Sequence, residues 1–144
     1  MHSTARPYIA AYLLLRRDDK VAFVLRSNTS YMDNHYSLPA GKIENDESYS
    51  AGAIREAFEE VGVKIEANNL KLVHVMHRRE ETDCVDMFFE TNNYTGEPHN
   101  AEPHVHSELV WLDTGSLPNN TIPYIKFAIE QIEKGNLYSE RGWA

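Results

Sequence analysis

Residues 41–63 read GKIENDESYSAGAIREAFEEVGV, and this stretch carries most of the information about fold and chemistry. From about Glu47 to Val61 the apolar residues recur at three- and four-residue spacing, which predicts an amphipathic α-helix. Asp46 is placed to cap the start of this helix, and Gly62 is placed to end it in the left-handed conformation. The apolar stripe expected to face the core comprises Ala51, Ile54, Ala57, Phe58 and Val61.

The same helix carries a cluster of glutamates. Glu56, Glu59 and Glu60 lie at positions i, i+3 and i+4, so their carboxylates share one face, which we expect opposite the apolar stripe. Like charges on adjacent turns repel one another, and hard divalent cations such as Mg²⁺ prefer carboxylate oxygens and would offset that repulsion. The cluster therefore indicates a metal site. The simpler alternative is a solvated acidic helix face, which is the commoner fate of a charge run.

Strands and loops alternate on both sides of this helix. Apolar runs at Tyr8–Leu15 and Val21–Leu25 predict a β-hairpin. The other elements expected are a surface loop at 26–35, extended segments at 36–40, 70–76, 85–90 and 109–112, a charged connection at 77–83, an irregular loop at 94–106, and a second helix at 122–134 ended by Gly135. This order predicts an α/β fold in which a mixed β-sheet lies between helices, with residues 1–144 forming one domain.

Composition limits the classes of partner. The formal net charge of -8 argues against a nucleic-acid polymer, whose binding proteins normally present a basic face. An acidic protein can still bind a phosphate if divalent cations lie between them. Cys84 is the only cysteine, which excludes an intrachain disulfide, and the apolar run at 8–15 is too short to span a bilayer. We therefore expect a cytoplasmic protein without a membrane partner.

The spacing within the decisive stretch is that of a known motif. Gly41 is followed by five residues, then Glu47, then seven residues, and then Arg55-Glu-Ala-Phe-Glu-Glu-Val-Gly-Val63. This resembles the Nudix box with every defining position filled, preceded by an extended segment that ends at Gly41. The whole-chain pattern is similar to the MutT-like branch of the Nudix hydrolases. The resemblance implies an α/β/α sandwich that is a monomer or a homodimer.

The resemblance also implies roles for the box residues. Glu47 is expected to pair with Arg55, which also orients Glu56, while Gly41 allows close approach of the backbone to phosphate and Gly62 is structural. Catalytic roles fall to Arg55 and the three glutamates, and Glu56 is left open between general base and metal ligand.

The metal ligands implied are Glu56 and Glu60, with Glu59 close behind, together with a backbone carbonyl from Ala40. Many relatives have glycine at the position of Ala40, a departure that should not prevent its carbonyl from acting as a ligand.

A further acid is expected on the 94–106 loop. Glu102 is the candidate metal ligand, Glu97 is the alternative, and a plain solvent-exposed acid is the simpler interpretation of either. The pair His104 and His106 could suggest zinc, but no further cysteine or histidine lies at ligand spacing. We therefore expect this pair to be a substrate-facing or surface feature.

Substrate contacts are expected around the start of the box. Gly41 and Lys42 should face phosphate, and Arg26 corresponds to a substrate-contact position of the family. Tyr36 and Ser37, followed by Leu38, lie where relatives build the nucleobase pocket. An ordinary surface lysine and ordinary strand packing are the simpler interpretations of these residues.

The resemblance implies hydrolysis of a nucleoside diphosphate linked to another group, with Mg²⁺ as cofactor and Mn²⁺ as its substitute. The favoured substrate is a small-molecule nucleoside triphosphate, oxidised purines such as 8-oxo-dGTP included, cleaved to monophosphate and pyrophosphate. ADP-ribose, a nucleotide sugar and a dinucleoside polyphosphate are alternative substrates. A nucleotide-binding module that has lost catalysis is a different class, but such modules usually have damaged box glutamates.

Overall fold

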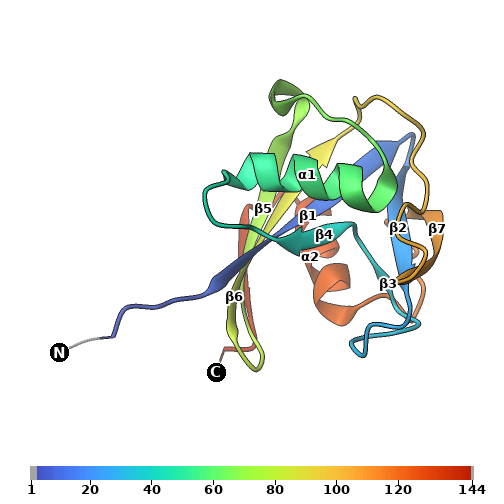
Figure 1. Ribbon diagram of the computed structural model, residues 1–144. Coiled ribbons are helices and arrows are strands. Elements are labelled where there is room, and N and C mark those ends of the chain that lie inside the picture. The colour runs from blue at the N-terminus through green and yellow to red at the C-terminus, as the bar shows by residue number, and fades with distance from the viewer. Residues whose placement is uncertain (1–2, 144) are drawn as a thin grey trace.

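The computed structural model describes residues 3–143, whose strands form one mixed sheet (Figure 1). The strands are β1 (Tyr8–Arg17), β2 (Lys20–Arg26), β3 (Tyr36–Ser37), β4 (Ala40–Lys42), β5 (Lys71–Arg79), β6 (Asp83–Thr91), β7 (His106–Asp113) and β8 (Tyr138–Arg141). The α-helices are α1 (Tyr49–Val61) and α2 (Pro123–Glu133), and a short 3₁₀ turn spans Ala67–Asn69. Neither α-helix is long and apolar enough to cross a membrane.

Strand β1 organises the sheet. The strand order is β3-β2-β1-β6-β5-β8, with β4 added on β1 and β7 on β2. β1 runs parallel to β6 and antiparallel to β2 and β4, so the expected hairpin and the expected mixed sheet are both confirmed. Alternate residues of β1 point to opposite faces. Tyr12 and Leu14 pack in the core beneath α2, whereas Leu13 and Leu15 pack in the core beneath α1.

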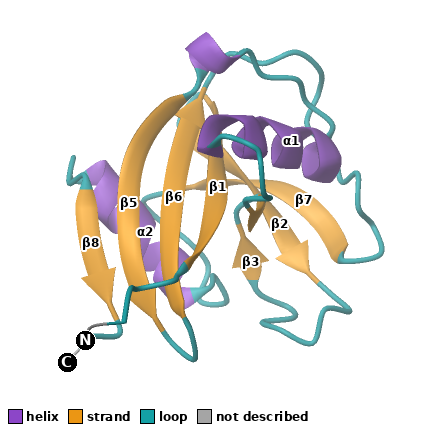
Figure 2. Cartoon of the chain, turned by 60° about the vertical axis from the view of Figure 1, so that its left-hand side comes forward, coloured by secondary structure: helices purple, strands orange, loops and turns teal. Residues whose placement is uncertain are grey.

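The two helices lie on opposite sides of the sheet (Figure 2), which confirms the expected α/β/α sandwich. The sheet and α1 meet through small residues, Ala53 and Ala57, both fully buried. Small side chains let the helix lie close to the sheet, which fixes the height at which the glutamates of α1 stand above β4.

The ends of α1 differ in part from expectation. Ser48 is the N-cap, and its Oγ accepts a hydrogen bond from the Ala51 N–H at 3.2 Å. The prediction that Asp46 is the cap was wrong: Asp46 has a φ of 67° and belongs to the preceding loop. Gly62 ends the helix with a φ of 74°, as predicted.

The expected apolar stripe of α1 was wrong in part. Ala51 is exposed and Phe58 is 54% exposed, whereas Glu60 is only 6% exposed. The buried face is turned toward Ala53 and Ala57, so it includes one carboxylate. The prediction that the three glutamates all lie opposite the buried face therefore fails at Glu60, which is covered by a later loop described below.

The segment 77–83 is mostly strand, not a connection. β5 and β6 continue until Arg79 pairs with Asp83, leaving a turn of three residues. Charged side chains fit inside these strands because Arg78 and Asp86 neutralise each other across the hairpin. The C-terminal segment adds a further strand, β8, which runs parallel to β5.

Candidate active site

Arg55 connects the loop before α1 to the glutamates of the helix. Its guanidinium donates two hydrogen bonds to Glu47, at 3.0 and 2.8 Å, and one each to Glu56 at 2.7 Å and Glu59 at 3.1 Å. Hydrogen bonds from Arg55 hold the pKa of Glu47 at about 2, and a backbone hydrogen bond from the Glu44 N–H contributes. The expected Glu47–Arg55 pair is therefore present, and it positions Glu56.

Gly41 and Ala40 lie directly under the glutamates. A Cβ atom at position 41 would overlap the carboxylate of Glu56, so glycine is required for the close approach of α1 to β4. The backbone N–H of Ala40 donates to Oε2 of Glu60 at 3.1 Å. Two box carboxylates are thus anchored against the same short strand.

Glu60 is a buried carboxylate in an unfavourable environment. Burial raises the pKa of Glu60 well above its ordinary value, and the neighbouring carboxylate of Glu56 raises it further, against a smaller opposing effect from the Ala40 N–H. Removing a carboxylate from water beside a second one is costly unless a positive charge compensates it. The geometry therefore favours a cation at this position.

The loop between β6 and β7 covers Glu60. The N–H groups of His99 and Ala101 donate to the carbonyls of Val61 and Glu60, both at 3.0 Å, which satisfies acceptors that the end of α1 leaves free. Gly62 is tightly packed here, since any side chain on it would overlap the imidazole of His99.

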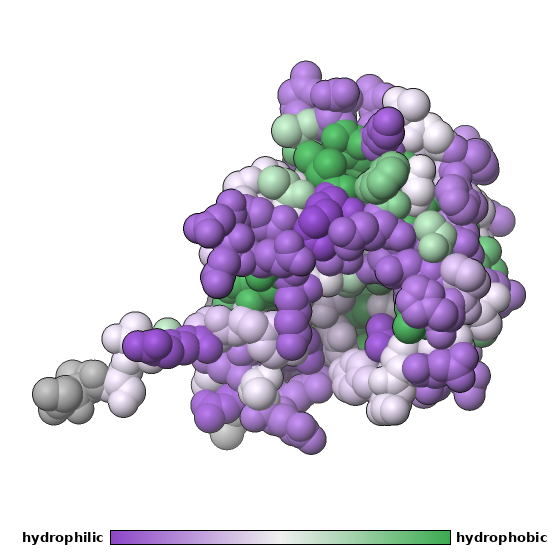
Figure 3. All heavy atoms as spheres, in the orientation of Figure 1, coloured by the Kyte–Doolittle hydropathy of each residue, from purple (hydrophilic) through white to green (hydrophobic). Residues whose placement is uncertain are grey.

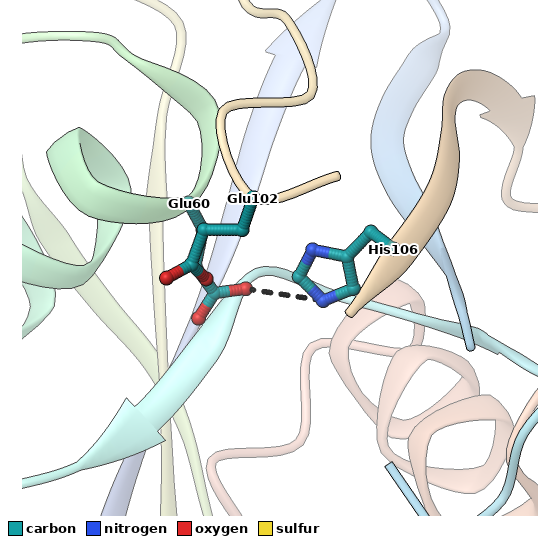
Figure 4. Close-up of side chains that lie close together, drawn as sticks. All are labelled: Glu60, Glu102 and His106. Atoms are coloured by element: carbon teal, nitrogen blue, oxygen red, sulfur yellow. Dashed lines mark ion pairs between the residues drawn. The ribbon is translucent and has the colours of Figure 1, made fainter. Parts of the chain in front are cut away.

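The same loop brings Glu102 to Glu60 (Figure 4). Glu60, Glu102 and His106 each offer a ligand atom, and these atoms lie within 4.8 Å of one another. Burial raises the pKa of Glu102, and Glu56 contributes. Glu97, the alternative acid, is exposed and pairs instead with Arg17 at 2.9 Å.

The two loop histidines occupy different environments. His104 is exposed, whereas His106 is 4% exposed and its Nε2 lies 3.8 Å from Oε1 of Glu60. The expectation of a surface feature is therefore wrong for His106. Burial, together with the positive charge of Arg26, lowers the pKa of His106 to about 4, so the imidazole is neutral at neutral pH.

The donor set fits a hard divalent cation. Glu56, Glu60 and Glu102 bring carboxylate oxygens together from α1 and the loop, and Ala40 lies at hydrogen-bonding distance from one of them. Glu59 is less enclosed, with its side chain 48% exposed. Hydrophilic side chains gather over α1 in the space-filling view (Figure 3), although Glu60 itself is buried.

A sequence model of the family described as the NUDIX domain matches residues 5–131, most of the chain. The chain belongs to the Nudix family. The prediction of a Nudix pyrophosphohydrolase is thereby confirmed at the level of the family. No curated protein sequence matches this chain significantly.

Solved Nudix structures share the fold. A MutT NUDIX hydrolase from Burkholderia pseudomallei superposes with a TM-score of 0.80 at 24% identity, over 88% of this chain and 98% of that one. The MutT protein from Methanosarcina mazei Go1 gives 0.75 at 21% identity, over 92% and 97%. The ORF135 protein of E. coli gives 0.77 at 20% identity, over 90% and 91%. At these identities the likeness establishes the fold and no more.

A cavity of about 370 Å³ adjoins the Nudix box, on the side of β4 that faces away from α1 and toward Tyr124 of α2. Ala40, Gly41 and Lys42 form one wall. The other lining residues are Tyr8, Ala10, Tyr12, Arg26, Tyr31, Ser37, Arg78, Glu80, Glu81, Thr82, Cys84 and Tyr124. The aromatic rings give flat apolar surfaces that suit a nucleobase, and Arg26 and Lys42 give positive charge that suits phosphate. Arg78 contributes less positive charge, because it is paired with Asp86 and Glu80.

The structure separates the residues expected to contact substrate. Arg26, Ser37, Gly41 and Lys42 line the cavity. Tyr36 does not, because its hydroxyl donates to Glu108 at 3.1 Å, and Leu38 is buried in the core beneath α2.

Sequence reasoning missed Arg78 and Tyr124. Nε of Arg78 donates to Asp86 at 2.6 Å, and its guanidinium carbon lies 3.9 Å from the centre of the Tyr124 ring. Burial raises the pKa of Asp86 in spite of the opposing effect of Arg78. The available signal was alternation: Arg78 continues the buried face of β5 after Met76, and Asp86 lies between Cys84 and Phe88 on the buried face of β6. The prediction of a connection at 77–83 concealed it.

Proposed function

We propose that this Nudix protein hydrolyses the phosphoanhydride of a nucleoside triphosphate, oxidised purines included, to a nucleoside monophosphate and pyrophosphate. The observation that carries the proposal is the convergence of Glu56, Glu60 and Glu102 on one side of the Ala40–Gly41 backbone, with the cavity on the other side. If the phosphate chain of the substrate passes alongside Ala40 and Gly41 from one side to the other, the nucleoside lies in the cavity and the phosphoanhydride lies beside the carboxylates.

The cofactor proposed is Mg²⁺, with Mn²⁺ as a substitute, held by Glu56, Glu60, Glu102 and the Ala40 carbonyl, with Glu59 at the rim. When bound, such a cation supplies charge neutralisation for the phosphate oxygens and acidifies a nearby water. Arg55 fixes Glu56 through a 2.7 Å hydrogen bond, so its carboxylate is already aimed at the reaction site.

The remaining residues bind and orient the substrate. Lys42 and Arg26 line the cavity and supply positive charge to the phosphates. Ser37 and the tyrosines Tyr8 and Tyr124 enclose the base. A carboxylate, Glu56 in this proposal, accepts the proton of the attacking water, whose oxygen replaces pyrophosphate on the α-phosphorus.

The acidic net charge suits a small-molecule nucleotide better than a nucleic-acid polymer. We propose a single domain over 1–144 that acts in the cytoplasm without a membrane partner, as a monomer or a homodimer. A nucleotide-binding module without catalysis is less well supported, because every box glutamate is present and Arg55 holds two of them in place.

A substrate panel tests the proposal. The protein is incubated with Mg²⁺ and canonical or oxidised triphosphates, ADP-ribose, nucleotide sugars and dinucleoside polyphosphates, and products are identified by chromatography. We expect pyrophosphate from triphosphates, complete loss of activity in EDTA, and a large loss in Glu56→Gln. Glu130→Gln, an exposed change on α2, is the matched control. A preference for ADP-ribose or nucleotide sugars would replace the proposed substrate, and no hydrolysis of any of them would overturn catalysis.

A further inference from the structure

His106 is buried without a hydrogen bond that explains its burial. It is 4% exposed, and within the described residues 3–143 its Nδ1 atom has no hydrogen-bond partner. Its Nε2 atom lies 3.8 Å from Oε1 of Glu60, beyond the length of a hydrogen bond. Buried polar groups are nearly always paired, so an imidazole left in this state indicates a partner that is not a protein atom.

The backbone presents His106 beside Glu102. The N–H groups of Val105 and His106 both donate to the carbonyl of Glu102, at 3.1 and 3.0 Å, and close one helical turn. In such a turn the side chains at i and i+4 share a face. Asn100 holds both ends, since its side chain donates to the His106 carbonyl at 2.8 Å and accepts from the Glu102 N–H at 3.2 Å.

This turn is fixed to the box helix. The N–H of Ala101 donates to the carbonyl of Glu60 at 3.0 Å, immediately before the turn begins. Glu60 itself is held at its other end by the Ala40 N–H. The side chains of Glu60, Glu102 and His106 therefore point toward one another from backbone positions that hydrogen bonds define (Figure 4).

We propose that His106 is a nitrogen ligand of a divalent cation shared with Glu60 and Glu102, and that this position prefers Mn²⁺ to Mg²⁺. Ligand atoms that lie within 4.8 Å of one another can surround one ion after small side-chain adjustments. Mg²⁺ demands oxygen ligands in a strict octahedron, whereas Mn²⁺ suits the two carboxylates and, as a transition-metal ion, accepts an imidazole nitrogen beside them. The inference rests on the proposed function for the location of the cation, and it adds a nitrogen ligand to the oxygen ligands proposed there.

Pulsed EPR of the full-length protein with Mn²⁺ alone, without nucleotide, tests the ligand directly. We expect a nitrogen hyperfine coupling in the wild type that changes when the protein carries isotopically labelled histidine. The coupling should disappear in His106→Gln and persist in His104→Gln, the exposed neighbour that serves as the matched control. Absence of the coupling in wild-type protein that binds Mn²⁺, or its persistence in His106→Gln, would overturn the proposal.

Binding selectivity gives a second readout. In His106→Gln the ratio of Mn²⁺ to Mg²⁺ association constants should fall by at least about tenfold, because only the transition metal loses a preferred ligand. Equal losses for the two ions would mean that His106 acts only on the shape of the loop, against the proposal. If His106→Gln does not fold, the labelled wild type still shows whether any histidine coordinates the ion, and absence of the coupling there overturns the proposal.

Hydrolysis is assayed separately. A nitrogen coupling in a protein that hydrolyses nothing would reject the proposed function and keep the ligand. Hydrolysis without the coupling would reject the ligand alone.

Discussion

Replacing Arg78 by methionine should strongly destabilise the protein, in a pH-dependent manner. Arg78 is 4% exposed and its partner Asp86 is fully buried, so the substitution leaves a carboxylate in the core without its counter-ion. Breaking such a buried pair costs about 3–5 kcal/mol. For a chain of this size that corresponds to a fall in Tm of roughly 10–20 °C.

The pH dependence follows from Asp86. Burial already raises the pKa of Asp86 above the ordinary 3.8, and loss of Arg78 raises it further. A carboxyl group whose pKa is raised in the folded state costs no stability at pH values below its unfolded-state pKa. The cost grows as pH rises from the unfolded-state pKa toward the folded-state pKa. Arg78→Met should therefore be mildest near pH 4 and most severe at pH 8.

Urea denaturation at several pH values measures the effect. The double variant Arg78→Met with Asp86→Leu should recover most of the loss, because apolar replacement of a buried ion pair is often neutral or stabilising. Arg79→Met, the exposed neighbour on β5, is the matched control and should cost less than about 1 kcal/mol. A cost for Arg78→Met below about 1 kcal/mol, or one independent of pH, would refute the reasoning.

Three other substitutions test the acids of the site. Glu60→Gln should lower kcat by about 10²–10³ while stabilising the protein in EDTA, since it removes a buried charge; normal turnover at saturating Mg²⁺ would exclude Glu60 from the site. Glu102→Gln should lower kcat more than Glu97→Gln, measured side by side, and the reverse order would remove Glu102 from the mechanism. Arg55 holds the pKa of Glu47 at about 2, so the Glu47–Arg55 pair stabilises the folded protein above the ordinary pKa of 4.5, and this stabilisation is lost as pH falls toward 2. In Glu47→Gln, the free energy of unfolding measured against pH should lack this fall between about pH 4.5 and pH 2.

The sequence predicted the features that local chemistry determines. Apolar spacing located α1, and the glycine that follows it located its end at Gly62, because both depend on residues within one or two turns of chain. The pairing of Glu47 with Arg55 followed from the resemblance to the Nudix box. The sheet type followed from the order of elements. The N-cap was misplaced by two residues because aspartate and serine are both good caps, and neighbouring backbone angles decide between them.

The errors lie where distant segments meet. Periodicity placed Phe58 in the core, yet Phe58 is exposed. The helix face that packs on the sheet is centred on the small residues Ala53 and Ala57, and Phe58 lies outside it. The sequence pattern placed Arg78 in a charged connection and Asp86 in a strand, and only the register of β5 with β6 brings them together. The charge or hydrophobicity of individual residues does not determine that register.

Burial of Glu60 shows why the site could not be assembled from its motif. The box places this carboxylate on α1, but the groups that enclose it lie some forty residues later, Glu102 in a loop and His106 at the start of β7. That loop stays in place because its N–H groups complete the hydrogen bonding at the end of the helix. Helix termination and the proposed cation site are thus coupled, since the carbonyl of Glu60 anchors the loop that brings Glu102 and His106 to the Glu60 carboxylate.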